Sequence, residues 1–212
     1  MVPANMTETG PMSILDGLPT SAEDMQNAAT LATPMIERAL AAMNLSPLQR
    51  SIMDLVKKGH ALADIYGLSQ DERDAMFARG CQLLQSGEIE KARDWLLFVH
   101  LLNMHDARVI YVIAVTYQTQ GNFSIAAKLY ASFIALDPTN PEGHLRLGEC
   151  LLSAREYQAA LTSFQRAKNE CARGNGAAEA AAHAARMLEH TLAKLAASNA
   201  TKLVRNANSQ RS

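Results

Sequence analysis

Histidine and cysteine are the residue types in this chain that support the widest range of chemistry. They are His60, His100, His105, His144, His183, His190, Cys81, Cys150 and Cys171. Only His183 and His190, seven residues apart, would share a helix face, and no carboxylate or cysteine completes a metal-ligand set with them. The cysteines are too widely spaced for a disulfide framework or a paired-cysteine zinc motif. The sequence therefore predicts reduced thiols, no metal site and no cofactor.

Motifs for catalysis and for nucleic-acid binding are also missing. No glycine-rich phosphate loop follows a strand, and no serine or cysteine stands in a nucleophile motif with a base partner. The net charge of −1 gives no general attraction to nucleic acid. The longest apolar stretches are far shorter than the roughly 20 residues that span a bilayer, and no basic and apolar leader begins the chain. We therefore expect a cytoplasmic, non-enzymatic protein that acts through a binding surface.

A repeat of 34 residues predicts the elements that would position such a surface. Small residues recur at Gly80, Ala114 and Gly148 and at Ala92, Ala126 and Ala160, and large ones at Ile89, Phe123 and Tyr157 and at Leu96, Tyr130 and Phe164. The small residues let two helices approach closely, and the large ones fill the space between helix pairs. The prediction is an all-α fold of three tetratricopeptide repeats, 73–106, 107–140 and 141–174, forming a short superhelical solenoid.

Turn residues follow the same period. Gly87 and Gly121 fall where the first helix of a pair must end, and glycine adopts the left-handed conformation there at least cost. Arg155 replaces this glycine in the third copy, so that turn lacks the residue that favours the left-handed conformation. Before the third repeat, Asn140 is expected to cap a helix that Pro141 begins.

The region before the repeats divides into an expected mobile tail, 1–20, and a helical region, 21–69. Pro34 interrupts the first helical pattern, which predicts a kink or two short helices with Thr33 capping the second. A second helix is expected from Pro47 to about Tyr66, with Ser46 as its cap and Gly67 as its stop. A capping box of Ser69 and Glu72 then begins the repeat array, 70–174, near Gln70.

One apolar face of the N-terminal helices exceeds what a short helix needs. The candidate dimerisation residues on it are Met25, Ala32, Ile36, Leu40 and Met43. Symmetric pairing of two chains is the commonest way to cover such a face. The competing interpretation is that the face folds back onto the repeats of its own chain. After the array, an alanine-rich capping helix is expected over 175–198 and a disordered tail over 199–212.

The first helix of each pair lines the concave side of such a solenoid, and the second, fifth, ninth and twelfth positions of each unit are expected to face inward. These positions are Asp74, Phe77, Cys81 and Leu84, then Arg108, Tyr111, Val115 and Gln118, then Glu142, Leu145, Glu149 and Leu152. Phe77, Tyr111 and Leu145 would form an apolar row that anchors an extended peptide, with polar groups beside it for the peptide backbone. The alternative is that Phe77 and Tyr111 are core aromatics.

Three short stretches carry a resemblance to a known family. They are Ala63-Asp64-Ile65-Tyr66-Gly67-Leu68, Gly148-Glu149-Cys150-Leu151-Leu152 and Ala184-Ala185-Arg186-Met187-Leu188-Glu189. From about His60 to Leu195 the chain resembles the class II chaperones of bacterial type III secretion, which hold translocator subunits before export. The resemblance implies a groove that takes a client segment of the form Pro-x-Leu-x-x-Pro, and dimers formed by the N-terminal helices.

The first-repeat groove positions depart from the family pattern. Members of that family are commonly aromatic at the positions of Phe77, Cys81 and Leu84, and here only Phe77 is aromatic. A client whose anchor differs is therefore expected. Two other functions stay open from the sequence: a general tetratricopeptide adaptor in another assembly, such as pilus biogenesis, and a chaperone that also activates a transcription factor when it is unloaded.

Overall fold

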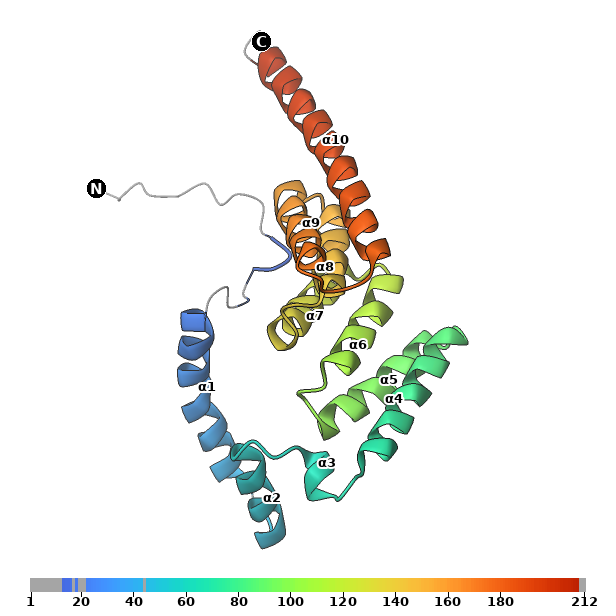
Figure 1. The fold of residues 1–212 in the computed structure, drawn as a ribbon. Helices are drawn as coiled ribbons and strands as arrows, with labels where there is room; N and C mark the ends of the chain where they lie inside the picture. Colours follow the sequence, from blue (N-terminus) through green and yellow to red (C-terminus); the bar gives the residue numbers. More distant parts are fainter. Residues whose placement is uncertain (1–12, 17, 19–21, 44, 210–212) are drawn as a thin grey trace, which may run out of the picture. The chain divides into compact units, whose positions relative to one another are not determined.

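The structure is a computed structural model that describes residues 13–16, 18, 22–43 and 45–209 (Figure 1). The described residues form ten α-helices and no strand, which confirms the predicted all-α class. The chain divides into two compact units within α6. The N-terminal unit is Gly17–Val109, and the C-terminal unit is Ile110–Ser212 together with residues 13–16. No helix in these described ranges is long and apolar enough to cross a bilayer.

The N-terminal unit begins with α1 (Ala22–Ala42), α2 (Pro47–Lys57) and α3 (Leu62–Ile65). α1 continues through Pro34, so the prediction of two short helices with Thr33 as a cap is wrong. Ser46 caps α2, as predicted, and it forms a capping box with Gln49.

The predicted single helix from Pro47 to Tyr66 is wrong, because α2 ends before Gly59. Gly59 takes a φ of +91°, its amide donates to Val56 O, and the amide of His60 donates to Leu55 O. These two bonds form a Schellman motif, which satisfies the last carbonyls of α2 and turns the chain away. Gly67 ends α3 in the same way.

Three consecutive helix pairs follow: α4 (Gln70–Gln85) with α5 (Ile89–Leu102), α6 (Ala107–Thr119) with α7 (Phe123–Leu136), and α8 (Pro141–Ser153) with α9 (Tyr157–Ala172). Their bounds agree with the 34-residue register. Ser69 and Glu72 form the predicted capping box at the start of α4, and Asn140 caps α8 by accepting from the amide of Glu142 at 3.1 Å.

Small residues lie at close helix crossings, as predicted, but Leu96 and Phe164 meet them inside a pair, whereas the prediction had these large residues filling the space between pairs. A Cβ added to Gly80 would lie 2.4 Å from Leu96 Cδ2, and one added to Gly148 would lie 2.5 Å from Phe164 Cε1. Both partners are fully buried, and so is Ala126. The helices can therefore approach this closely only because glycine has no side chain at these two crossings.

The third turn has the same conformation as the first two although it lacks glycine. Gly87, Gly121 and Arg155 all have positive φ, with 64° at Arg155. In each turn this residue donates its amide back to the preceding helix, and in the third the amides of Arg155 and Glu156 bond to Leu152 O and Leu151 O. The backbone of the repeat thus overrides the usual cost of a left-handed arginine.

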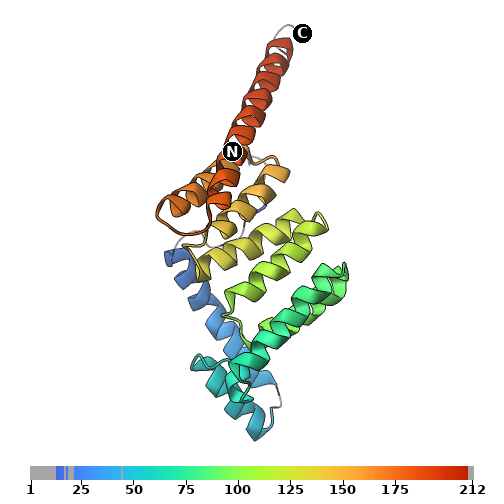
Figure 2. The same cartoon turned by 45° about the vertical axis from the view of Figure 1, so that its right-hand side comes forward.

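The C-terminal unit ends in α10 (Ala178–Ser209), which packs against α9 and α8 and extends past both of them (Figures 1 and 2). The prediction of a disordered tail is wrong for residues 199–209, and residues 210–212 lie outside the described residues. Alanine, lysine and leucine are strong helix formers in that segment, and they outweigh its asparagines.

The prediction of a mobile tail over 1–20 is wrong for residues 13–16. Ile14 and Leu15 are half-buried against the core of the C-terminal unit. That core joins α6, α7, α8, α9 and α10 and includes Tyr130, Leu145 and Phe164. Residues 1–12 are outside the described part of the chain.

Candidate peptide-binding surface

The predicted inward-facing positions fall in both units, and each unit is described by itself. Asp74, Phe77, Cys81, Leu84 and Arg108 belong to the N-terminal unit. Tyr111, Val115, Gln118, Glu142, Leu145, Glu149 and Leu152 belong to the C-terminal unit.

In the N-terminal unit, Phe77 is a half-buried ring covered by a cation. The Arg108 guanidinium lies 5.1 Å from the Phe77 ring centroid, within the range of a cation–π interaction. Arg108 also donates to Asp74 at 2.9 Å and to Asp106 at 2.8 Å. Hydrogen bonds to Asp106 and Asp74 raise the pKa of Arg108 above its usual range, so the guanidinium stays charged. The first-repeat surface therefore combines an aromatic ring with an arginine that two carboxylates hold in place.

The other two first-repeat positions, Cys81 and Leu84, are half-buried. Burial raises the pKa of the Cys81 thiol, although the nearby Arg108 charge opposes this. The thiol is therefore neutral near pH 7 and behaves as a small apolar group.

In the C-terminal unit, Tyr111 is held on two sides. Its half-buried ring lies 5.6 Å from the Tyr130 ring in an edge-to-face arrangement and 5.2 Å from the Phe133 ring. Its hydroxyl accepts a hydrogen bond from Arg146 Nε at 3.2 Å. Tyr111 is therefore part of the packing of α6 on α7 as well as part of the predicted surface.

A chain of polar contacts extends from Tyr111 over three helices. Arg146 donates to Glu149 Oε2 at 3.1 Å, and Gln118 Nε2 donates to the same oxygen at 2.8 Å. Gln118 Oε1 in turn accepts from the Tyr130 hydroxyl at 2.6 Å. We call these five residues, Tyr111, Gln118, Tyr130, Arg146 and Glu149, the Tyr111 network. It joins α6, α7 and α8.

The charge state of the Tyr111 network follows from its burial. Burial lowers the pKa of Arg146, but the bond to Tyr111 and the charge of Glu149 outweigh burial and raise this pKa overall. Burial raises the pKa of Tyr130, so its hydroxyl stays protonated and can donate. His183 on α10 lies 3.4 Å from Glu149 Oε1 and adds a second basic group beside that carboxylate.

The predicted apolar row is wrong at Leu145, because this residue is only 1% exposed and lies in the core. α8 packs against α7, α9 and α10, so a position that would face outward in a less covered helix lies in the core. The neighbouring Arg146, which is half-buried, lies beside Tyr111 where Leu145 was predicted to lie. Val115, Gln118, Glu142, Glu149 and Leu152 are each half-buried.

Sequence reasoning missed the contacts of Arg146 and His183 with this surface, and it missed the hydroxyl bond of Tyr130, whose ring is core as predicted. Arg146 directly follows the predicted Leu145, and Tyr130 was predicted as core filling. Only the packing of α7 and α10 brings their polar atoms to Gln118 and Glu149. The described residues contain no cluster of three or more histidine, cysteine, aspartate or glutamate side chains arranged to hold a metal ion.

The candidate dimerisation face lies in the N-terminal unit. Of its predicted residues, Ala32 is half-buried and Met43 is exposed, while the side chains of Met25, Ile36 and Leu40 lie outside what the structure describes. Leu31 and Met35 on the same helix are 74% and 66% exposed. The described part of α1 thus presents large apolar side chains to solvent.

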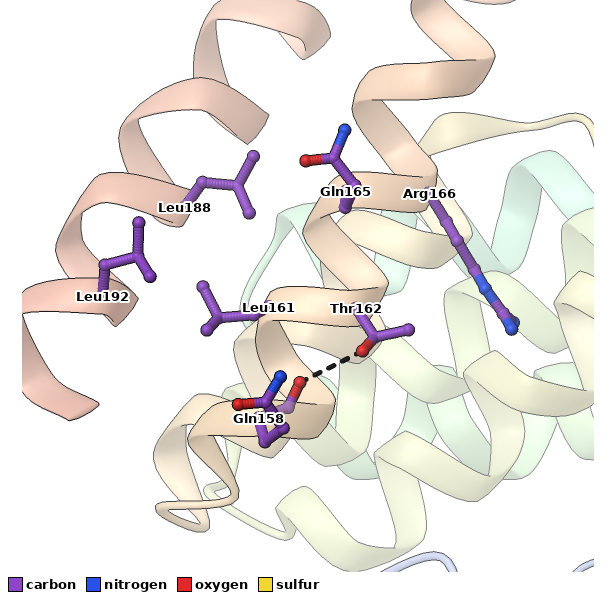
Figure 3. Close-up of a pocket in the computed structure, with 7 residues that line it drawn as sticks. All are labelled: Gln158, Leu161, Thr162, Gln165, Arg166, Leu188 and Leu192. Carbon is purple, nitrogen blue, oxygen red and sulfur yellow. Dashed lines mark hydrogen bonds between the residues drawn. The ribbon is translucent and has the colours of Figure 1, made fainter. Parts of the chain in front are cut away.

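A pocket of about 420 Å³ lies between α9 and α10, away from the predicted positions (Figure 3). Leu161 from α9 points toward Leu188 and Leu192 from α10, and Gln158, Thr162, Gln165 and Arg166 line the rest. Thr162 is turned back onto the Gln158 carbonyl at 3.2 Å. This pocket belongs to the second-helix side of the repeat and is separate from the Tyr111 network.

Comparisons with known proteins agree with this fold. Residues 111–178 match the family described as Tetratricopeptide repeat. The Chaperone protein SicA of Salmonella typhimurium is 25% identical over 114 residues, which cover 54% of this chain and 69% of that protein.

Two solved structures extend the similarity. A T3SS complex from Aeromonas hydrophila has a TM-score of 0.64 and 26% identity, covering 68% of this chain and 97% of that one. PcrH of Pseudomonas aeruginosa in complex with the chaperone binding region of PopD has a TM-score of 0.58 and 26% identity, covering 60% and 96%. The predicted resemblance to type III secretion translocator chaperones and the predicted repeat fold are confirmed.

Proposed function

We propose that this chain, which resembles the class II chaperones of type III secretion, is a cytoplasmic chaperone that holds a translocator protein before export. The observation that carries the proposal is the Tyr111 network, which places an aromatic ring, a guanidinium, an amide and a carboxylate at or beside predicted groove positions. The similarity to PcrH, which is solved with the chaperone binding region of PopD, supports the same function. SicA, also named as a chaperone, supports it as well.

The mechanism is capture of an extended client segment without any covalent step. Apolar anchors of the client would pack on the exposed edge of Tyr111 and on Val115 and Leu152. The client backbone offers amides and carbonyls, and Glu149 and Arg146 are suited to bond them. A segment of this size would bind with a Kd on the order of micromolar, because ordering an extended peptide offsets much of the contact energy.

The N-terminal unit would contribute a second anchor at Phe77. Because Arg108 covers one face of that ring, a client side chain that packs there meets a cation as well as an aromatic edge. Because Asp74 and Asp106 already pair with Arg108, a neutral acceptor such as a backbone carbonyl next to the anchor would be favoured over an acidic group. The family that this chain resembles commonly has aromatic residues at the positions of Cys81 and Leu84. Their absence here is consistent with a client whose anchor differs.

Arg146→Met tests the role of the Tyr111 network in binding. Methionine keeps the apolar stem and removes the guanidinium that bonds Tyr111 and Glu149. The matched control is Arg166→Met, since Arg166 is an exposed arginine on α9 of the same unit. The measurement is the Kd for a client protein that the wild type captures. We expect Arg146→Met to raise this Kd at least tenfold, equal to about 1.4 kcal/mol, and Arg166→Met to leave it unchanged.

The identity of the client is tested by pull-down from native cytosol, followed by identification of the bound protein. A membrane-inserting translocator supports the proposal. Consistent capture of a pilus-assembly subunit instead would favour the general adaptor. Equal client retention by the wild type and a folded Arg146→Met variant would remove the network from the binding site.

A further inference from the structure

The N-terminal segment at residues 13–16 makes a two-point contact with one carboxylate at the turn between α8 and α9. The Ser13 hydroxyl donates to Glu156 Oε2 at 2.6 Å, and the Ile14 amide donates to Glu156 Oε1 at 2.6 Å. The two ends of this contact are 143 and 142 residues apart in the chain. Hydrogen bonds to a carboxylate are among the stronger ones in proteins, and two of them in parallel also fix orientation.

The docked segment is itself ordered as a turn. Ser13 Oγ accepts from the Leu15 amide at 3.1 Å, and Ser13 O accepts from the Asp16 amide at 3.0 Å. The serine hydroxyl therefore serves twice, as a donor to Glu156 and as an acceptor within the turn. Ile14 and Leu15 are half-buried against the core of the C-terminal unit, which adds apolar contact to the polar one.

Glu156 differs in its bonding partners from the residues at the equivalent positions of the other two repeats. The equivalent positions, 34 residues apart, are Glu88, Asn122 and Glu156, and each precedes the second helix of its pair. None of the three side chains caps that helix. The Glu88 carboxylate bonds to Lys91, whereas the Glu156 carboxylate bonds to residues 13 and 14.

We propose that Glu156 and the adjoining apolar surface form a docking site for a serine-led turn, and that residues 13–16 of the same chain occupy it as a built-in ligand. The site takes a serine or threonine followed by two apolar residues. A proline directly after the serine is excluded, because it has no amide to donate. Residues 13–16 are then an internal competitor for any segment of another protein with this chemistry.

Hydrogen exchange of the full-length chain tests the docking. Glu156→Gln removes the charge that both donors share, and Glu88→Gln is the matched control at the same repeat position. Ser13→Glu places a second carboxylate next to that of Glu156, and the two groups repel each other. We expect exchange at the amides of residues 14–16 to quicken about tenfold or more in Glu156→Gln and Ser13→Glu, and to stay unchanged in Glu88→Gln. Unprotected amides in the wild type, or equal effects of the two glutamines, would overturn the proposal.

A synthetic peptide of residues 11–18 tests occupancy. It should bind the Ser13→Glu chain, in which the site is vacated, at least tenfold more tightly than the wild type, and adding Glu156→Gln should abolish that binding. Equal binding to the wild type and to Ser13→Glu would mean that the segment does not fill the site. Protection of residues 14–16 should also be independent of protein concentration; loss of protection on dilution would place the segment on a second copy and refute docking within one chain.

Discussion

Replacing Tyr111 by glutamate should destabilise the protein, although a purely exposed groove residue would tolerate the charge. The ring makes two aromatic contacts, with Tyr130 at 5.6 Å and with Phe133 at 5.2 Å. Each such pair contributes about 0.5–1.5 kcal/mol, so the loss of both costs about 1–3 kcal/mol. A new ion pair with Arg146 would restore at most about 1 kcal/mol, since the site is partly exposed.

Tyr111→Phe separates the ring from its hydroxyl. It keeps both aromatic contacts and removes only the bond from Arg146, which at a half-exposed site is expected to cost about 1 kcal/mol. For a chain of this length, 1 kcal/mol corresponds to a shift of about 2–4 °C in Tm. The expected order of Tm is therefore wild type, then Tyr111→Phe a few degrees lower, then Tyr111→Glu lower again.

Thermal unfolding followed by far-ultraviolet circular dichroism measures this order directly. Tyr66→Phe is a suitable control, because Tyr66 is an exposed tyrosine outside the repeats. A Tyr111→Glu chain that melts within about 1 °C of the wild type would show that the two ring contacts contribute nothing, at the scale expected for aromatic pairs. The conclusion that the Tyr111 ring stabilises the fold by packing on Tyr130 and Phe133 would then be refuted.

Three other outcomes are expected. Ala126→Glu places a charge in a fully buried helix crossing and should lower the free energy of unfolding by several kcal/mol, which an unchanged Tm would contradict. Light scattering should find a dimer for the full chain and a monomer for a chain that starts at Ser46; the same state for both would move the interface away from α1. Burial lowers the pKa of His144, so the unfolded state takes up its proton first and stability should fall as the pH drops below about 6.5. In His144→Gln the loss of Tm between pH 7.5 and 5.5 should be smaller, and an identical loss would exclude His144 as its source.

Local signals were sufficient to predict the helix pairs. Gly87 and Gly121 end first helices as the period requires, Ser69 and Asn140 cap where predicted, and Gly80 and Gly148 lie at close helix crossings as predicted. Each of these depends on residues that are near one another in the chain, so the sequence contains the information needed.

The errors have two physical origins. Gly59 is a local signal, because this left-handed glycine and its Schellman motif end α2 inside the predicted helix. Leu145, Arg146 and residues 13–16 depend instead on long-range packing. α10 covers α8, and Glu156 holds a segment more than 140 residues away, which periodicity within one repeat does not encode.

The glycines at the two tight crossings also constrain how this array can diverge. Because Gly148 and Phe164 share one volume, as do Gly80 and Leu96, neither partner can drift alone without a clash or a void. The equivalent positions of the middle repeat are Ala114 and Tyr130, which are both fully buried in one core. Accepted substitutions should therefore arise in pairs, and positions 80 with 96, 114 with 130, and 148 with 164 should covary among homologous sequences.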